Sequence, residues 1–266
     1  MKDPAELYYD SPFALNFYDQ MWGKDSDIHI GLHDVDQDFA RACSRTLDWL
    51  VQPVRPVLHS TLLDLGSGFG GPLRRCEEKG FRGTGLNISS AQNRIAVERG
   101  RSIGINPVIV KGSFEDLPFS EGQFDIVMSM DSFVHSERKF RILEEAFRVL
   151  RPNGVLVFTD LMVAEEAAAE EVQPLLERIK LSSMGTSSGY LSMAARAGFG
   201  PQVFEDRSAC AAIHYRKLYE ALGEKLNSPS GLTDDELTMM KGCDLWATAG
   251  ENGTLVWGKF TMVKPA

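Results

Sequence analysis

The sequence predicts an α/β fold around a mostly parallel sheet, and three observations predict it. Between residues 60 and 160, short β-rich apolar runs alternate with stretches of helical period, the pattern of parallel strands joined by crossover helices. A glycine-rich run at 66–71 follows the first of these strands directly. The 266 residues are 43% hydrophobic and 24% charged, which is enough apolar surface for one large domain.

Five strands and three helices are expected in residues 60–160. The last helix is the clearest, because apolar side chains recur at helical spacing from Phe140 to Leu150 and should face the sheet. Pro152 should stop this helix, and Gly154 should permit a left-handed turn after it. The expected strands are 60–65, 84–88, 107–111, 124–129 and 154–160, and the expected helices are 72–79, 90–103 and 138–150.

After residue 160 the regular alternation stops and helices dominate. No low-complexity linker separates this part from the rest, so the extra helices should cover the same domain as a cap. The expected helices are 165–181, 189–197, 209–226 and 233–247, and the expected strands are 202–206 and 254–263.

Charge and composition argue against several classes of protein. With 28 Lys and Arg against 37 Asp and Glu, the formal net charge is −9, so no broad surface for nucleic acid or anionic lipid is expected, although a local basic patch is allowed. The N-terminal residues are acidic where a signal peptide is basic and then apolar, and no apolar run approaches about 18 residues. We therefore expect a cytoplasmic protein without membrane association. Scattered cysteines predict reduced thiols and no metal site: Cys43, Cys76, Cys210 and Cys243.

The most informative run is 63–71, between a predicted strand and a predicted helix. Its glycines permit a tight turn and let a ligand lie against bare backbone. The spacing from Gly66 through Gly68 to Gly70 is G-x-G-x-G, not the G-x-G-x-x-G of dinucleotide binders, and no Gly-Lys-Ser/Thr of a phosphate loop follows. A ligand without a pyrophosphate is therefore favoured over a nicotinamide cofactor, with an ordinary glycine-rich turn as the alternative.

Polar side chains follow the next two strands. Asn87 ends the second strand 21 positions after Gly66, where nucleoside-binding sheets usually place Asp or Glu on the ribose hydroxyls. An amide can also donate and accept there, and Gln92, one turn into the next helix, is a second candidate unless it lies on a solvated face. After the third strand, Ser113 can bond an adenine edge and Phe114 can cover its ring; a helix cap and a core aromatic are the alternatives.

These runs, with 115–118, 124–127 and 150–154, resemble the motif series of class I S-adenosylmethionine-dependent methyltransferases. The resemblance implies a Rossmann-like seven-stranded mixed sheet with an antiparallel last strand, helices on both faces and a helical cap over the active site. It also implies one domain over 1–266, with a cofactor-binding half at 60–160 and cap or substrate-binding elements at 1–50 and 163–250. The residues it implies for S-adenosylmethionine are Ile30, Asp64, Gly66, Gly68, Asn87, Ile88, Gln92, Ser113, Phe114, Met130 and His135.

A narrower similarity covers nearly the whole chain. Runs such as 8–11, 28–32 and 173–179 are similar to the sarcosine/dimethylglycine N-methyltransferases of betaine synthesis. This family is Trp-Ser-Gln-Asp-Ala where the chain has 128–132, and Asp-Pro-Met where it has 160–162. Methyl transfer to sarcosine or N,N-dimethylglycine is therefore expected, with another small N, C or O acceptor, such as a natural-product intermediate, as the alternative. A catalytically silent cofactor-binding subunit is a third possibility, and the oligomeric state is open.

The resemblance and the chemistry of an amine acceptor together suggest catalytic and acceptor-binding residues. His135, just after the fourth strand, is a base, a group that positions the cofactor, or a structural loop histidine; an imidazole suits a base because it titrates near neutral pH. Tyr18 is the second catalytic candidate. A glycine-derived acceptor needs a cation for its carboxylate, for which Arg178 is preferred over Lys180 and Arg45, with a surface charge as the alternative for each. The expected acceptor-binding residues are Trp22, Met162, Arg178, Tyr190, Tyr215 and Trp246, and His29 and His214 are weaker catalytic candidates.

Overall fold

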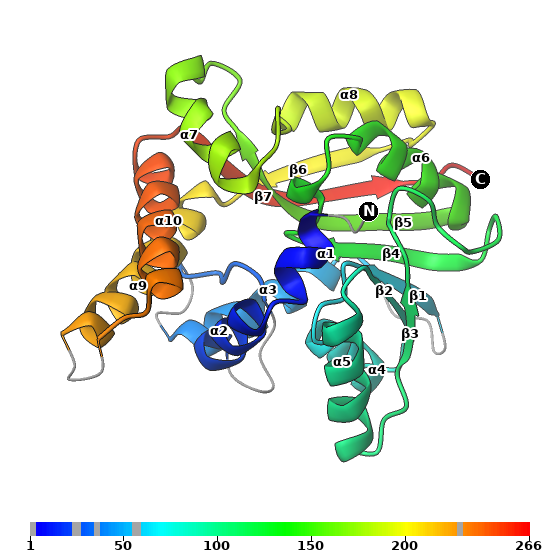
Figure 1. The fold of residues 1–266 in the computed structure, drawn as a ribbon. Coiled ribbons are helices and arrows are strands. Elements are labelled where there is room, and N and C mark those ends of the chain that lie inside the picture. The colour runs from blue at the N-terminus through cyan, green and yellow to red at the C-terminus, as the bar shows by residue number, and fades with distance from the viewer. Residues whose placement is uncertain (1–3, 23–27, 35–37, 55–59, 228–230) are drawn as a thin grey trace.

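The computed structural model describes the chain outside residues 1–3, 23–27, 35–37, 55–59 and 228–230. Its centre is a seven-stranded sheet in the order β3-β2-β1-β4-β5-β7-β6, and β7 runs antiparallel to both of its neighbours (Figure 1). The predicted seven-stranded mixed sheet is confirmed. The strands are β1 Thr61–Leu65, β2 Arg82–Asn87, β3 Val108–Lys111, β4 Phe124–Met130, β5 Leu150–Val163, β6 Gln202–Asp206 and β7 Leu255–Val263.

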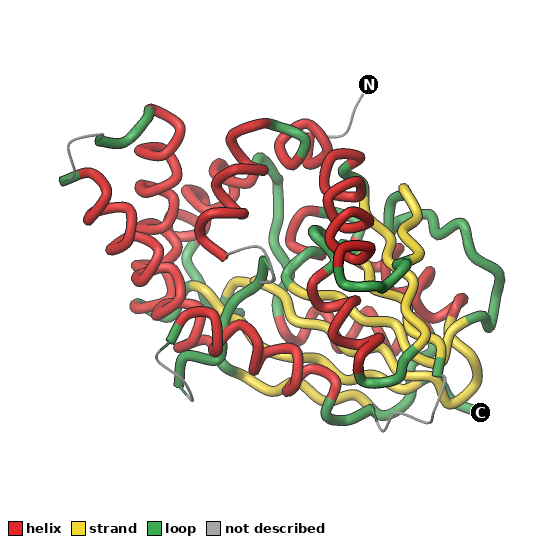
Figure 2. The backbone as a smooth tube through the Cα atoms, turned by 90° about the horizontal axis from the view of Figure 1, so that it is seen from below, coloured by secondary structure: helices red, strands yellow, loops and turns green. Residues whose placement is uncertain are grey.

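Helices cover both faces of this sheet (Figure 2). On one face, α6 (Lys139–Val149) and α8 (Ser187–Ala197) pack through Leu143 and Ala194 against Phe158. On the other face, α3 (Phe39–Val51) and α4 (Gly71–Glu78) pack through Leu47 and Leu73, beside α5 (Ser90–Ser102). Each face buries apolar surface, so a strand such as β5 must carry apolar side chains on both faces of the sheet.

The remaining helices form the end of the molecule where the strands β1, β4 and β5 finish. They are α1 Pro4–Tyr9, α2 Pro12–Trp22, the 3-10 turn η1 Phe133–His135, α7 Ala169–Ile179, α9 Ser208–Leu226 and α10 Asp234–Glu251. Helices α9 and α10 lie side by side at one end of the sheet (Figure 1). No helices were predicted in residues 1–50, although Pro4 and Pro12 stand at first helical positions, where proline is favoured.

The start of β5 differs from the expectation in two ways. The strand begins at Leu150, so residues 151–154 belong to it rather than to a separate turn. The left-handed residue is Asn153, with φ 63°, and not Gly154. Gly154 is instead needed for close approach, because a Cβ there would lie 2.8 Å from the carbonyl oxygen of Arg151. Helix α7 is also shorter than the predicted 165–181, and α10 continues to Glu251.

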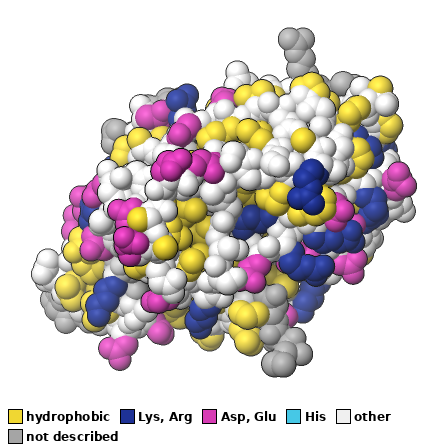
Figure 3. All heavy atoms as spheres, turned by 90° about the horizontal axis from the view of Figure 1, so that it is seen from above, with side chains coloured by type: hydrophobic (Ala, Val, Ile, Leu, Met, Phe, Trp, Pro, Cys, Tyr) yellow, Lys and Arg dark blue, Asp and Glu magenta, His cyan; other side chains and the backbone are white. Residues whose placement is uncertain are grey.

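Charged side chains are unevenly distributed over the surface. Figure 3 shows one face of the molecule, on which Lys and Arg gather mostly toward one side and Asp and Glu mostly toward the other. None of the helices in the described part of the chain is long and apolar enough to cross a bilayer. The four cysteines are free and buried.

Three buried histidines join the N-terminal segment to α3 and α9. His29 Nε2 lies 2.7 Å from the carbonyl oxygen of Cys43 and therefore carries the proton. His214 Nδ1 lies 3.3 Å from the backbone nitrogen of Gly31 and 3.1 Å from His33 Nε2, so it is an acceptor and its ring is neutral. Burial lowers the pKa of His29 to about 3 and that of His214 well below its usual value.

We expect His29 to make the folded state sensitive to acid. Its pKa is lower in the folded than in the unfolded chain, so stability is lost as pH falls from about 6.5 toward 3, by about 1.4 kcal/mol per pH unit. Other groups also titrate in this pH range. Asp160 changes the stability with the opposite sign, because its pKa is raised to about 7. The test therefore compares the pH slope of the unfolding free energy of His29→Gln with that of the wild type between pH 6.5 and 4.5. The variant should have the shallower slope; parallel slopes would contradict the prediction.

Candidate active site

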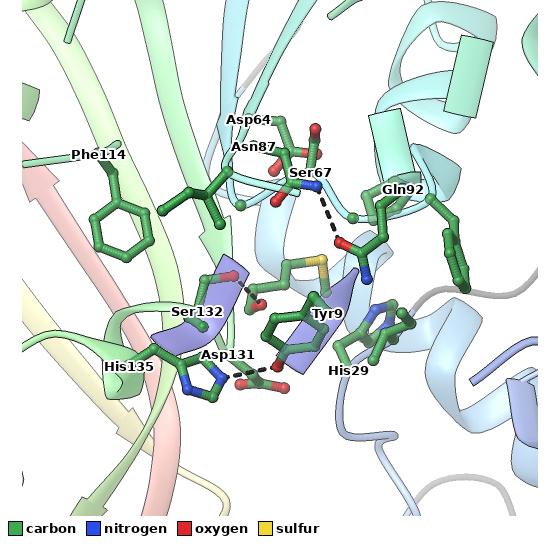
Figure 4. A pocket seen from close by; sticks show the side chains of 18 of the residues that line it. Tyr9, His29, Asp64, Ser67, Asn87, Gln92, Phe114, Asp131, Ser132 and His135 are labelled. Atoms are coloured by element: carbon green, nitrogen blue, oxygen red, sulfur yellow. Dashed lines mark hydrogen bonds between the residues drawn. The ribbon is translucent and has the colours of Figure 1, made fainter. Parts of the chain in front are cut away.

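A cavity of about 1000 Å³, including its open mouth, lies at the carboxyl ends of β1, β2 and β4 (Figure 4). The carboxyl ends of parallel strands at the point where strand order reverses are the usual ligand crevice of such sheets. Ten of the residues predicted to bind the cofactor line the cavity, and Ile30 does not. They are Asp64, Gly66, Gly68, Asn87, Ile88, Gln92, Ser113, Phe114, Met130 and His135.

The glycine-rich turn after β1 forms one wall of the cavity. Gly66 and Gly68 have φ values of 81° and 51°, a left-handed conformation that side chains disfavour. Backbone hydrogen bonds from Gly66 and Ser67 to the carbonyl oxygen of Leu86 fix this turn against β2. A Cβ at Gly66 would lie 2.3 Å from Ser132 Oγ, so only glycine fits between β1 and the segment after β4.

Two amides lie on the side of the cavity formed by β2 and α5. Asn87 Nδ2 donates to Gln92 Oε1 at 3.0 Å, and both side chains are buried (Figure 4). Gln92 is therefore not on a solvated helix face. Ser89, which caps α5 through its hydroxyl, sets the direction of the helix that carries Gln92. Paired amides can donate to and accept from adjacent hydroxyl groups such as those of a ribose.

Phe114 lies across the cavity from Gln92 and His29 (Figure 4). Its ring contacts Phe133 edge-on at 5.6 Å, which holds it at the wall, and Ser113 lies beside it. Ile88 and Met130 add apolar surface. A flat apolar slot with a polar rim suits a purine ring.

Asp131 lies in the cavity wall at the point where β4 ends. Its backbone is left-handed, with φ 53°, and its carboxylate accepts from the backbone N–H of Ile30 at 2.8 Å and from Trp257 Nε1 at 2.7 Å. Burial raises the pKa of Asp131, against these two hydrogen bonds, which favour the charged form. Ile30 thus acts through its backbone, while its neighbours Ile28 and His29 line the cavity. A fixed carboxylate here suits a cationic ligand.

Tyr9 reaches into the cavity from α1 and meets His135. The tyrosine hydroxyl lies 2.9 Å from His135 Nε2 (Figure 4). Burial raises the pKa of Tyr9 above its usual value, so its hydroxyl stays neutral. Tyr9 was not predicted as a site residue, and Tyr18, which was, has its hydroxyl facing that of Tyr8 at 3.4 Å instead. The sequence signal that could have identified Tyr9 was its place in the run 8–11, which is similar to the N-methyltransferases.

Helix α1 is held over the cavity by polar contacts at its end and along its side. Asp10 accepts from Ser89 Oγ at 2.7 Å and from the backbone N–H of Ala91 at 3.0 Å, at the N-terminus of α5. Lys111, at the end of β3, forms an ion pair with Glu6 at 2.7 Å. Ala5 and Tyr9 consequently cover the cavity, which limits access of water.

Beyond Tyr9 lies a cluster of aromatic side chains around Arg178 of α7. Tyr215 stacks on Trp246 with ring centroids 5.8 Å apart, and Trp22 donates through Nε1 to the carbonyl oxygen of His29. Burial raises the pKa values of Tyr8, Tyr9 and Tyr215, and in each case the positive charge of Arg178 acts in the opposite direction. Arg178 Nη2 contacts Met239 Sδ at 3.5 Å, and Met239 belongs to the buried cluster against which Tyr8 and Tyr215 pack.

Two predicted acceptor-binding residues lie elsewhere. Met162 and Tyr190 are fully buried in the core between the sheet and α8, and the Tyr190 hydroxyl donates to Asp160 at 2.6 Å. The side chain of Met162 follows the alternation of β5 to the face opposite Leu161, away from the cavity. We therefore do not retain either residue as a contact of the acceptor.

The cavity has the groups that S-adenosylmethionine requires. Ser67 Oγ and His29 Nδ1 are buried without a hydrogen-bond partner in the described structure, and both residues line the cavity. The space beside Gly66 would be filled by any Cβ. Unsatisfied buried polar atoms are costly unless a ligand pairs with them. The amide pair, the aromatic slot and the Asp131 carboxylate correspond to a ribose, a purine and a cationic centre.

The sheet order, the glycine turn and this cavity define a class I S-adenosylmethionine-dependent methyltransferase. Residues 63–158 match the methyltransferase domain family. Sarcosine/dimethylglycine N-methyltransferase of Halorhodospira halochloris is 37% identical over 265 residues, which cover 97% of this chain and 95% of that protein. The chain belongs to the family of sarcosine/dimethylglycine N-methyltransferases, and it is a methyl-transferring enzyme (EC 2.1.1) that uses S-adenosylmethionine.

Two further relatives agree with this assignment. The glycine/sarcosine/dimethylglycine N-methyltransferase of Actinopolyspora halophila is 38% identical over 96% of this chain, and the chain spans only 46% of the length of that relative. A solved structure from Galdieria sulphuraria, assigned to the sarcosine dimethylglycine methyltransferases, is 33% identical with a TM-score of 0.86 and covers 94% of this chain and 97% of its own.

Proposed function

We propose that this enzyme methylates the nitrogen of sarcosine or N,N-dimethylglycine. The observation that carries the proposal is Arg178, a half-buried cation without an ion-pair partner in the described structure, beside the aromatic cluster at the Tyr9 end of the cavity. A buried cation needs a counter-charge, and the carboxylate of a glycine derivative supplies one. The names of the relatives agree with this acceptor class.

The guanidinium of Arg178 has hydrogen-bonding capacity that the described side chains do not use. Its Nε atom is buried with no hydrogen-bond partner, and Nη2 contacts only the weak acceptor Met239 Sδ at 3.5 Å among the bonds described. Gly242 of α10 lies against the guanidinium, where a Cβ would be 2.4 Å from Nε. Lys180 and Arg45, the other candidates, are exposed. An arginine fork with unused donors suits a bidentate carboxylate.

The opposite end of the acceptor would be its methylated nitrogen. Tyr9 and Asp131 both line the cavity, and Tyr215 packs against the buried cluster that contains Trp257, the hydrogen-bond partner of Asp131. Aromatic faces and a carboxylate stabilise an N-methylated cation. A zwitterion would thus lie with its carboxylate toward Arg178 and its nitrogen toward the cavity.

The mechanism needs a neutral amine in line with a methyl group. Bound S-adenosylmethionine supplies that methyl group as an electrophile. An amine with a pKa near 10 loses its proton at a cost of about 4 kcal/mol at pH 7. In our proposal Tyr9 accepts this proton while its own proton moves to His135 Nε2, and Asn87, Gln92, Ser113 and Phe114 hold the cofactor. The covering helix α1 excludes water, and alignment supplies much of the rate.

Tyr9→Phe should lower kcat by about tenfold to a hundredfold with little change in the acceptor KM, because it removes the hydroxyl that bonds His135. The matched control is Tyr8→Phe, whose hydroxyl faces Tyr18 and should matter little. Steady-state rates of S-adenosylhomocysteine release from pH 6 to 10 provide the measurement. Because both residues serve one proton path, Tyr9→Phe combined with His135→Gln should be no slower than the worse single variant. Additive losses would argue against the relay.

The alternative, another small N, C or O acceptor, was suggested by the two segments that depart from the family pattern, 128–132 and 160–162. Met130 and Ser132 line the cavity, so part of the first departure faces the ligands. The other two departures, Met128 and Leu161, are buried in the core instead. The departures from the family pattern thus alter two residues of the cavity wall. We take so small a change to favour the glycine-derived acceptor over a larger natural-product intermediate.

Release of S-adenosylhomocysteine with purified enzyme tests the proposal. Glycine, sarcosine and N,N-dimethylglycine are compared with N,N-dimethylethanolamine, which lacks the carboxylate, and with a panel of phenols and keto acids. We expect turnover with sarcosine or N,N-dimethylglycine and at least a hundredfold lower kcat/KM without the carboxylate. Turnover only with acceptors outside the glycine derivatives would reject the proposal.

A further inference from the structure

The segment 131–136, here called the His135 loop, carries a catalytic candidate in a conformation that needs support. It contains the left-handed Asp131 and the 3-10 turn η1, Phe133–His135. Such irregular backbone persists only where surrounding groups hold it. Groups outside the cavity lining must therefore hold the His135 loop as well.

Asp160 of β5 holds the middle of the loop. Its Oδ1 accepts from the backbone N–H of Val134 at 2.8 Å, directly before His135 in the chain. Its Oδ2 accepts from the hydroxyl of Tyr190 at 2.6 Å. Both Asp160 and Tyr190 have no exposed surface. Burial raises the pKa of Asp160 to about 7, and Lys139 and Tyr190 act against that rise, so these two neighbours favour the charged carboxylate.

Lys139, at the start of α6, holds both ends of η1. Its ammonium donates to the carbonyl oxygen of Phe133 at 3.3 Å and to that of Ser136 at 2.5 Å. The side chain is only 6% exposed, and Asp160 is its stabilising charge. The backbone around His135 is thus bonded through one N–H to the buried Asp160 carboxylate and through two carbonyl groups to the buried Lys139 ammonium.

The surrounding core is shaped to keep this pair in place. The ring of Tyr190 contacts Phe158 and Phe260, with centroids 5.2 Å away in each case. Gly185 lies over Lys139 and Tyr190, where a Cβ would be 2.8 Å from the Tyr190 ring and 3.1 Å from Lys139 Cε. Buried charged side chains are often no more stabilising than apolar side chains of the same volume, so stability alone does not account for Asp160 and Lys139 at this place.

We propose that Asp160, Lys139 and Tyr190 form a positioning network that holds His135 at the cavity for the transfer step. None of the three lines the cavity, so they act through the backbone of the His135 loop. The inference rests on the proposed function in so far as His135 acts in turnover. A displacement of about 1 Å at a reacting group can cost a hundredfold in rate, so loosening this network should be visible in kcat.

Tyr190→Phe is the primary test, because it removes one hydroxyl and keeps the ring in the core. We expect a fall in kcat of about tenfold or more with an unchanged acceptor KM and unchanged S-adenosylmethionine affinity. Asp160→Asn should have a larger effect. Val157→Ala is the matched control, since Val157 lies in the same strand but is buried on the opposite face of the sheet. An equal loss of kcat in Val157→Ala would overturn the proposal.

A second measurement keeps the test independent of the acceptor. In ¹⁵N-histidine-labelled protein, the His135 resonances are assigned by their absence in His135→Gln. In Tyr190→Phe they should shift and the titration of His135 should change, while Val157→Ala leaves both as in the wild type. If the wild type turns over no glycine derivative, the proposed function fails and this spectrum alone decides the positioning role. Unmoved His135 resonances, or wild-type kcat in Tyr190→Phe, would overturn it.

Discussion

Gly66→Val should abolish detectable S-adenosylmethionine binding while the protein stays folded. The backbone at Gly66 has φ 81°, and a Cβ would lie 2.3 Å from Ser132 Oγ and 2.6 Å from Ser132 Cβ. Both residues line the cavity, so a branched side chain either enters the cofactor's space or displaces the end of β4. We expect at least a thousandfold loss of affinity, about 4 kcal/mol, measured by titration calorimetry. The S-adenosylmethionine affinity of Gly66→Ala should lie between that of Gly66→Val and that of the wild type.

Gly104→Ala is the control for backbone strain. Gly104 has nearly the same φ, 82°, but a Cβ there meets no atom within 4 Å. This variant should bear the same conformational cost and bind the cofactor as the wild type does. Circular dichroism and thermal unfolding establish that each variant is folded. Retained tight binding in folded Gly66→Val would show that the cofactor does not lie against this turn.

Arg178→Gln should lower kcat/KM for N,N-dimethylglycine by about a hundredfold or more. The glutamine keeps a hydrogen-bonding group but removes the charge that we assign to the acceptor carboxylate, and loss of one partner of a buried charge pair costs about 2–5 kcal/mol. Arg178 does not line the cofactor cavity, so S-adenosylmethionine affinity should not change. Calorimetry and initial rates separate these two effects.

Two controls make the Arg178 result specific. Lys180→Gln removes an exposed charge from the C-terminal end of the same helix and should leave kcat/KM within about twofold. Any residual activity on N,N-dimethylethanolamine should be the same in Arg178→Gln as in the wild type, because that acceptor has no carboxylate. Equal losses on both acceptors would assign Arg178 to the structure of the cap instead.

Much of the cofactor half could be read from residues 60–160 because its signals are local. A strand, a glycine turn and a helix follow one another within about 20 residues, and the carboxyl ends of parallel strands must meet at one edge. Asn87, Gln92, Ser113 and Phe114 accordingly line one cavity. The cap was harder to read, since helix α1 has six residues and little helical period of its own. Its position depends on contacts of Glu6 and Asp10 with distant elements.

The class of fold and the strand ends at which we expect the cofactor could thus be predicted from short-range pattern and parallel topology, and the cofactor itself from the resemblance of these runs to a known family. Which side chains meet could not be predicted in this way. Tyr9 and His135 are 126 positions apart, and nothing between them predicts a 2.9 Å contact. Tyr190 likewise belongs to the buried support of the His135 loop and not to an acceptor pocket, because packing of α8 on β5 directs its hydroxyl to Asp160. Side-chain direction on a strand or helix depends on what it packs against, and a pattern of residue types does not contain that partner.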